Sequence, residues 1–245
     1  WDKSDTVMYN YNLSELLGML PRLPHEEITQ KHKDLAYAVQ KTYEMVFFDL
    51  LNYVHEKYDT QNICLGGGCA YNGLANGKIY KETKFTNLWI PPAPSDAGSS
   101  VGSVINYRVS KGKKVSIPKT PFLGPSYRIN SKFKKYLKDR KYIHLEKSDL
   151  LFSIVAKEIR RGKVVGFFRD EIEFGSRALG NRSILADPTN PNMKNRINEL
   201  VKRREGFRPF APMVTKEGQH QFFHMVEDVP YMNQVVRVKV IMLTN

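Results

Sequence analysis

Residues 173–212 constrain this chain most, because their composition fits neither a buried core nor an ordinary solvated face. Within 32 residues they include six arginines among glycines, asparagines and hydroxyl side chains: Arg177, Arg182, Arg196, Arg203, Arg204 and Arg208. Guanidinium groups beside flexible backbone and short polar groups suit a compact oxyanion such as phosphate. The stretch therefore predicts loops that bind a small phosphorylated substrate.

The length of the chain and its apolar content predict a globular protein of one large or two ordinary domains. It has 245 residues, of which 41% are hydrophobic and 26% charged. No apolar run reaches the roughly 18 residues of a membrane span, no signal peptide is visible, and there are only two cysteines. We therefore expect a cytoplasmic protein without a membrane partner. Because the first residue is Trp1, we also expect a processed product or a fragment.

The net charge of +13 favours anionic partners such as nucleotides, phosphates or nucleic acid. The lysine clusters at 111–119 and 132–141 are interpreted as a solvated linker and an exposed helix face. A basic nucleic-acid-binding module is thus an alternative function. Acidic residues argue against it, because Glu173, Asp187 and Glu205 interrupt the basic stretch, and no ladder of stacking aromatic residues is evident.

The pattern along the chain predicts a mixed α/β (α+β) fold. Apolar residues at helical spacing mark helices at 34–57, 98–109, 148–161 and 190–203, with Asp34 as the first N-cap and Gly162 at a C′ position. Short apolar or alternating runs mark strands at 62–65, 85–90, 164–168 and 235–240. Because segment 111–125 is rich in Lys, Pro and Gly, it indicates a linker between two domains, 1–115 and 116–245.

Two features of the first region could bind ligands. Gly66, Gly67 and Gly68 follow a predicted strand, where they form either a tight turn or a backbone contact to a nucleotide phosphate. Asp96 stands at a predicted helix start, as an N-cap or as a carboxylate ligand of a divalent metal. The two cysteines, Cys64 and Cys69, are interpreted as small buried hydrophobic residues.

The arginines of the second region form two loops. Arg177 and Arg182 flank Gly180-Asn181, so a single loop could place both on one ligand. Lys202–Arg204 end a predicted helix, where the dipole alone favours cations, and Arg208 follows four residues later. Two loops built of arginine and small residues in one domain favour an oxyanion site.

Four motifs, in this order and spacing, resemble the NodU/CmcH family of O-carbamoyltransferases. They are LGGGCAYN at 65–72, PPAPSDAG at 91–98, EFGSRALGNRSILADP at 173–188 and VKRREGFRPFAP at 201–212. The resemblance implies an actin-like ASKHA ATPase domain followed by a YrdC-like domain. It also implies that 1–115 is the carboxy-terminal part of the first domain and that 116–245 is most of the second.

The resemblance further implies a reaction. The YrdC-like domain would convert carbamoyl phosphate to carbamate and phosphate, and carbamate and ATP would then give carbamoyl adenylate and pyrophosphate. The ASKHA-like domain would transfer the carbamoyl group to the hydroxyl of a small-molecule acceptor, with an iron-type divalent metal at the site. Sugar, antibiotic and lipo-oligosaccharide acceptors all stay open.

Matching the motifs residue by residue gives each position an expected role. ATP would lie against Gly66, Gly67, Gly68, Asn72 and Gly98. Asp96 would be a metal ligand. The catalytic arginines, which would stabilise charge on the departing phosphate, are Arg177, Arg182, Arg204 and Arg208. Carbamoyl phosphate would also bind Asn181, Ser183 and Lys202.

The chain departs from the family pattern at Ser176, where the family usually has proline. The amino-terminal half of the ASKHA-like domain, the histidines that should complete its metal site and the family's carboxy-terminal Asp-Gly-Thr-Ala-Arg segment are missing from the sequence. We therefore expect the 245 residues alone to lack carbamoyl transfer.

Overall fold

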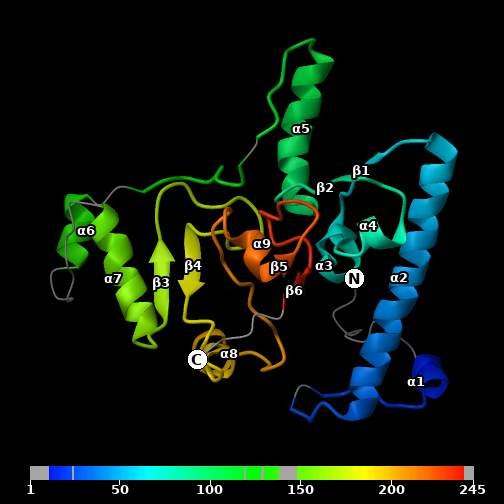
Figure 1. Cartoon of the computed structure of the whole chain (residues 1–245), viewed down its shortest axis with the longest axis horizontal. Coiled ribbons are helices and arrows are strands. Elements are labelled where there is room, and N and C mark those ends of the chain that lie inside the picture. The colour runs from blue at the N-terminus through cyan, green and yellow to red at the C-terminus, as the bar shows by residue number, and fades with distance from the viewer. Residues whose placement is uncertain (1–10, 24, 119, 128–129, 138–147, 240–245) are drawn as a thin grey trace. The chain divides into compact units, whose positions relative to one another are not determined.

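The computed structural model describes residues 11–23, 25–118, 120–127, 130–137 and 148–239 (Figure 1). The chain divides into two compact units, Trp1–Leu51 and Asn52–Asn245. In the described residues it is a mixed α/β protein, as the sequence predicts, with three two-stranded sheets. None of the helices in these ranges is long and apolar enough to span a membrane.

The first unit holds helix α1 (Tyr11–Leu17) and most of helix α2 (Gln30–Tyr58). The prediction that Asp34 caps α2 is wrong, because the helix begins four residues earlier and Asp34 accepts a bond from Gln30 Nε2 at 2.7 Å inside it. Thr29 closes the amino-terminal end instead. Its backbone N–H donates to His32 Nδ1 at 3.1 Å, which satisfies a donor that the helix leaves open.

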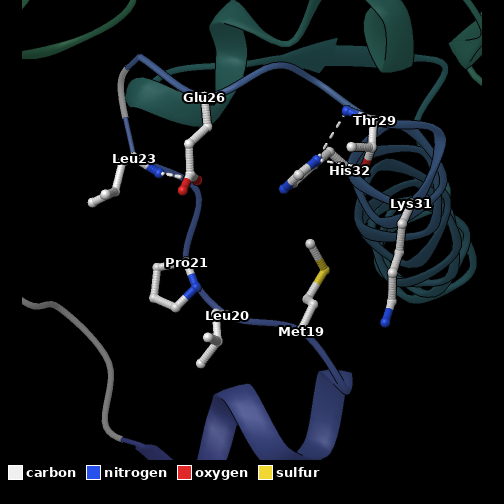
Figure 2. Close-up of a pocket in the computed structure, with 8 residues that line it drawn as sticks. All are labelled: Met19, Leu20, Pro21, Leu23, Glu26, Thr29, Lys31 and His32. Atoms are coloured by element: carbon white, nitrogen blue, oxygen red, sulfur yellow. Dashed lines mark hydrogen bonds between the residues drawn. The ribbon is translucent and has the colours of Figure 1, made fainter.

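A shallow hollow lies in the first unit between the segment after α1 and the start of α2 (Figure 2). Its lining runs from Met19 to His32, and within it Leu23 N–H donates to the Glu26 carboxylate at 2.8 Å. None of the predicted site residues lines it. The hollow is therefore not the site that the sequence motifs indicate.

In the second unit, strands β1 (Asn62–Cys64) and β2 (Asn87–Trp89) pair in parallel, with Ile63 opposite Leu88. The crossover between them carries the 3₁₀ turn η1 (Gly68–Tyr71) and two short helices, α3 (Gly73–Asn76) and α4 (Ile79–Glu82). Buried apolar side chains of these elements and of the segments next to them form a local core: Ala70, Ala75, Ile79, Phe85, Leu88, Ile90 and Ala93. Helix α5 (Asp96–Ser110) follows the proline-rich loop.

Further along, α6 (Ser131–Tyr136) and α7 (Ser148–Arg160) precede the antiparallel pair β3 (Val165–Phe168) and β4 (Arg182–Leu185) (Figure 1). Helix α8 (Met193–Arg196) continues as the π-helical segment η2 (Ile197–Lys202). Helix α9 (Gln219–Phe222) leads into β5 (Phe223–His224), which pairs with β6 (Arg237–Val238).

Most predicted elements are confirmed, with shifted ends. Gly162 is the C′ residue of α7, with φ of +76°, and Lys163 N–H donates to Glu158 O at 3.1 Å, the pattern of a Schellman cap. The strand β4 was not predicted, because its residues lie inside the arginine-rich motif. One interpretation is wrong: Cys64 and Cys69 are exposed, not buried. The interpretation of segment 111–125 as a linker stays a prediction. Within this segment, Gly124 N–H donates to Ile172 O at 2.9 Å.

Residues 227–235, which we call the C-terminal strap, pack against α3 and α4. Val235 N–H donates to Gly73 O at 2.8 Å, and Gln234 Nε2 donates to Glu227 Oε1 at 2.7 Å. Burial, followed by the hydrogen bond to Glu227, raises the pKa of Tyr80 to about 12. The strap thus joins two parts of the second unit that are far apart in sequence.

Gly77→Ala is expected to destabilise the chain by about 2–3 kcal/mol, because a Cβ there would lie 2.0 Å from Val235 O. The backbone at Gly77 has φ of −66°, so alanine fits the dihedral angles and the cost comes from the clash alone. Gly102→Ala is the control, since a Cβ at this exposed α5 position meets nothing within 4 Å. Urea unfolding should show no loss for the control, and equal midpoints for both variants would refute the expected clash.

Candidate functional site

The glycine turn 66–68 is open on one side and fixed on the other. A Cβ added at Gly66, Gly67 or Gly68 meets nothing within 4 Å, so a ligand has room to approach the backbone. Gly67 has φ of +87°, a conformation that favours glycine, and its N–H donates to Pro94 O at 2.7 Å. The turn and the proline-rich loop 91–95 are therefore held together.

Gly98 is required by close packing, because a Cβ there would lie 2.0 Å from Ala93 O. Asn72 has a structural role, since its Oδ1 accepts from Ala75 N–H at 3.2 Å and caps α3. Gly98 and Asn72, both expected to contact ATP, thus shape the loops around the turn. The open surface itself is the backbone of the three glycines.

Asp96 is the first residue of α5 and is exposed, with Ser95 in the N-cap position. Within the ranges that the structure covers, no group of three His, Cys, Asp or Glu side chains is arranged to hold a metal ion. One exposed carboxylate does not make a metal site. The described part of the chain therefore does not fit a complete metal centre.

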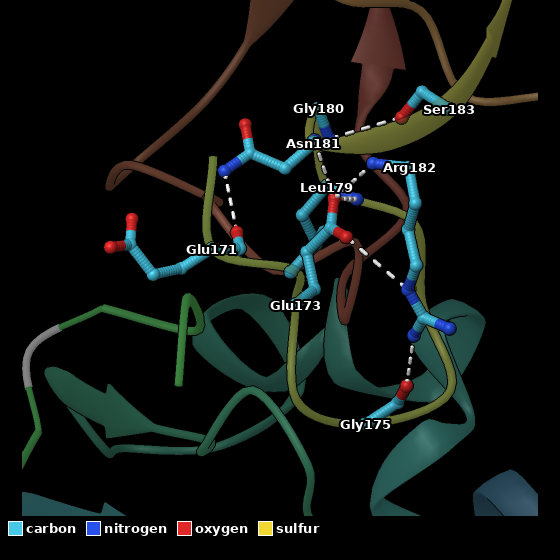
Figure 3. A network of polar contacts seen from close by, with 8 residues as sticks. All are labelled: Glu171, Glu173, Gly175, Leu179, Gly180, Asn181, Arg182 and Ser183. Carbon is cyan, nitrogen blue, oxygen red and sulfur yellow. Dashed lines mark hydrogen bonds and ion pairs between the residues drawn. The ribbon is translucent and has the colours of Figure 1, made fainter. Parts of the chain in front are cut away.

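Glu173 organises the loop between β3 and β4 (Figure 3). Its side chain is 0% exposed, and Oε1 accepts from the backbone N–H groups of Leu179 at 2.6 Å and Asn181 at 2.7 Å. Oε2 accepts from Arg182 Nε at 3.2 Å, and Arg182 Nη2 donates in turn to Gly175 O. One buried carboxylate therefore closes residues 173–182 into a ring.

The charge of Glu173 is stabilised by this arrangement. Burial of the carboxyl by itself raises its pKa, but backbone N–H donors, including those of Leu179, Asn181 and Arg182, outweigh burial and leave the pKa below its ordinary value. Gly175 and Gly180, with φ of +112° and +120°, supply the left-handed backbone that the tight ring needs. Glu173 is thus ionised and fixes the shape of the loop.

Three of the predicted ligand-binding residues have partners inside this loop. Arg182 is bound by Glu173 and Gly175, Asn181 Nδ2 donates to Glu171 O at 2.7 Å, and Ser183 Oγ accepts from Gly180 N–H at 3.0 Å. These contacts build the loop that presents Arg177.

Arg177 belongs to the same loop, and its side chain reaches the first motif. Its guanidinium is 5.4 Å from the centre of the Tyr71 ring, and Tyr71 belongs to η1, directly after the glycine turn. Arg177 Nε and the Tyr71 hydroxyl are both buried without a hydrogen-bond partner. Close contact of the backbones permits this approach, since a Cβ at Gly175 would lie 3.0 Å from Ala93 Cβ. The structure thus brings Arg177 against Tyr71, three residues after the predicted nucleotide turn.

The second arginine loop is built around Asn198, which is fully buried. Asn198 Oδ1 accepts from Arg204 Nε at 2.8 Å, and the Arg204 guanidinium stacks 4.9 Å from the centre of the Phe210 ring. Arg208 Nε donates to Glu205 at 2.8 Å, while Lys202 ends η2 and is exposed. Among the residues that the structure describes, no hydrogen bond or ion pair of Arg204 or Arg208 reaches the 173–183 loop.

Two residues important to this geometry, Glu173 and Tyr71, were not identified as functional from the sequence. In the sequence, Glu173 interrupts the basic charge and opens the third family motif, and no role is assigned to it. Its role could have been predicted from the sequence, because a single acidic residue at the start of a glycine- and arginine-rich loop is a candidate acceptor for the N–H donors of that loop. Tyr71 carried no such signal, because its neighbour Arg177 is more than a hundred residues away in sequence.

Two family models match the chain, "Carbamoyltransferase N-terminus" at residues 3–105 and "Carbamoyltransferase C-terminus" at residues 156–243. The glycine turn and Tyr71 fall in the first match, and the loop that presents Arg177 falls in the second. The chain therefore belongs to the carbamoyltransferase family, and the family resemblance stated from the motifs is confirmed.

Within this family the chain is similar to NodU-like proteins. It is 36% identical to Nodulation protein NolNO of Sinorhizobium fredii over 86% of this chain and 32% of that protein. It is 34% identical to Nodulation protein U of Rhizobium fredii over 73% of this chain and 29% of that one. "Uncharacterized protein sll1178" of Synechocystis sp. is 38% identical over 95% of this chain and 39% of its own length. The chain thus spans about two fifths or less of these relatives.

Proposed function

We propose that this chain supplies the nucleotide turn and the carbamoyl phosphate loop of an O-carbamoyltransferase. One observation carries the proposal: Arg177, on the loop closed by Glu173, lies over Tyr71 beside the open turn 66–68. The two buried polar atoms there, Arg177 Nε and Tyr71 Oη, lack partners, and oxygen atoms of a phosphorylated ligand would satisfy them. Membership in the carbamoyltransferase family supports carbamoyl transfer as the chemistry.

In the proposed reaction, water attacks carbamoyl phosphate to give carbamate and inorganic phosphate. A carbamate oxygen then attacks the α-phosphorus of ATP, and pyrophosphate leaves. Finally the acceptor hydroxyl attacks the carbamoyl carbon of the adenylate, AMP leaves, and the hydroxyl proton passes to solvent or a base. Arg177, Arg204 and Arg208 would stabilise negative charge on departing phosphate groups, with Lys202, Asn181 and Ser183 near carbamoyl phosphate. Arg182 would act by holding the loop.

The turn fits a nucleotide, because its backbone is exposed and leaves room for phosphate oxygens. A divalent metal would have Asp96 as one ligand, but the described residues provide no further ligand set, so no step is assigned to the metal. The ASKHA-like and YrdC-like folds, the cytoplasmic location and the small-molecule hydroxyl acceptor belong to the same proposal.

The proposal predicts that carbamoyl phosphate and ATP each raise the melting temperature of the 245-residue chain. At a ligand concentration 100 times Kd the gain is about 2.7 kcal/mol. Protection by either ligand should persist between about 50 and 200 mM salt, a range in which RNA binding weakens steeply. Absence of protection by both ligands would refute the proposal. Salt-sensitive binding of RNA without ligand protection would favour the nucleic-acid alternative instead.

A further inference from the structure

Two asparagines are buried where the C-terminal strap crosses α3. Asn76 is fully buried, and its Nδ2 donates both to Ala70 O at 2.9 Å and to Asn233 O at 2.8 Å. Asn233 is 6% exposed, and its own Nδ2 donates to Ile90 O at 3.2 Å. The two side chains therefore direct their N–H donors to backbone carbonyls of three different segments.

Two of these carbonyls, those of Ala70 and Ile90, belong to the segments that frame the glycine turn. Ala70 lies in η1, which begins at Gly68. Ile90 immediately precedes the proline-rich loop 91–95, whose Pro94 O accepts the N–H of Gly67. The Asn233 side chain thus contacts one of these segments directly, and the backbone carbonyl of Asn233 is joined to the other through Asn76. Asn233 lies 143 residues further along the chain than Ile90, outside the four sequence motifs.

If the Asn233 side chain only filled space in the core, an apolar side chain would stabilise the fold more. Burying a side-chain amide costs free energy unless its polar atoms find partners. The Asn233 side-chain N–H donates to Ile90 O. Among the described contacts, no side chain of the motif 65–72 donates to that carbonyl. A buried hydrogen bond of this kind fixes a loop in one position, whereas apolar packing tolerates small shifts.

We propose that Asn233 is a positioning residue for the nucleotide turn: the C-terminal strap, through Asn233 and Asn76, holds the turn 66–68 and the loop 91–95 in register. The inference rests on the proposed function in one respect, that the turn binds a nucleotide. The positioning of the turn is a property of the unliganded chain. The carboxy-terminal region of the chain thereby completes a site whose motifs lie in the amino-terminal region.

The test replaces Asn233 by aspartate, which has the same shape but turns a carboxylate oxygen towards Ile90 O instead of a donor. Hydrogen–deuterium exchange of the unliganded chain should become at least about tenfold faster in peptides covering 64–72 and 88–96, equivalent to one lost hydrogen bond. Exchange in β3 and β4 should stay unchanged. ATP affinity, measured by calorimetry, should fall about tenfold for the same reason.

The control is Asn87→Asp, which makes the same charge change at an exposed position of β2, where Asn87 Nδ2 donates to the neighbouring Thr86 Oγ1. It should leave exchange and ATP affinity at the wild-type values. If Asn233→Asp does not fold, Asn233→Ser serves in its place, because a serine hydroxyl is too short to reach Ile90 O.

The two claims fail in different ways. If the wild-type chain does not bind ATP, the proposed nucleotide site is wrong, and the exchange data alone decide whether Asn233 positions the two segments. If exchange in 64–72 and 88–96 is unchanged in the Asn233 variant, the positioning role is wrong. A uniform rise that includes β3 and β4 would also overturn it, because Asn233 would then be a general stabilising residue.

Discussion

Glu173→Gln is expected to lower the free energy of unfolding by about 3 kcal/mol. The amide oxygen could still accept from Leu179 and Asn181, but the amide NH₂ would face the Arg182 Nε–H, donor against donor. The Arg182 guanidinium would also lose the negative charge of the buried Glu173 carboxylate with which it pairs. The expected loss of stability lies at the low end of the range for a broken buried ion pair, because the Arg182 side chain is 38% exposed and keeps contact with water.

The matched control is Glu171→Gln, two residues earlier, where the side chain is exposed and only the backbone carbonyl takes part in the loop, through Asn181. It should change stability by less than about 0.5 kcal/mol. Urea unfolding of both variants measures the difference. Equal stability of the two variants would show that the Glu173 carboxylate does not hold the loop.

The same carboxylate gives the expected pH dependence of the wild-type chain. Because the pKa of Glu173 is lower in the folded state than its ordinary value, the ionised group stabilises the fold fully above that ordinary value. This stabilisation is lost as the pH falls through the lowered folded pKa. The difference in stability between wild type and Glu173→Gln should therefore shrink below about pH 4, near the ordinary glutamate range.

Arg177→Ala is expected to weaken carbamoyl phosphate binding by about 10- to 100-fold, equivalent to one lost charged hydrogen bond of about 1.5–3 kcal/mol. Its effect on stability should be small, because the loop is closed by Glu173 and Arg182 and not by Arg177. Since Arg177 lies over Tyr71, ATP affinity should fall as well. Arg177→Lys keeps the charge without the planar fork, so its affinity should fall between those of wild type and Arg177→Ala.

Arg108→Ala is the matched control for Arg177→Ala. It removes the same charge from an exposed position of α5, about 18 Å along the helix axis from Asp96. Isothermal calorimetry should give the wild-type affinity for this control. Unchanged binding in Arg177→Ala, or an equal loss in both variants, would mean that the arginine acts only through overall charge.

The position of each motif could be predicted from local sequence. The run 62–65 into three glycines, the α7 cap at Gly162 and the strand at 164–168 depend on residues a few positions apart. Strand β4 could not be predicted in this way. Its residues pair because Phe168 and Arg182 face each other across a loop that the Glu173 carboxylate closes, and neither fact is encoded in the spacing of apolar residues.

The sequence by itself determined the family and the mixed α/β class, and it indicated candidate residues for binding a phosphorylated ligand, because motifs and periodicity are properties of neighbouring residues. Only the tertiary structure decided which arginine reaches the glycine turn and which ones hold a loop. Arg177 meets Tyr71, Arg182 is bound by Glu173, and Asn233 lies beside Asn76. These pairings join residues that are distant in sequence, so they depend on which segments the fold packs together. For Glu173 and for the Asn76 side-chain N–H, the need of a buried polar group for a partner adds to this packing.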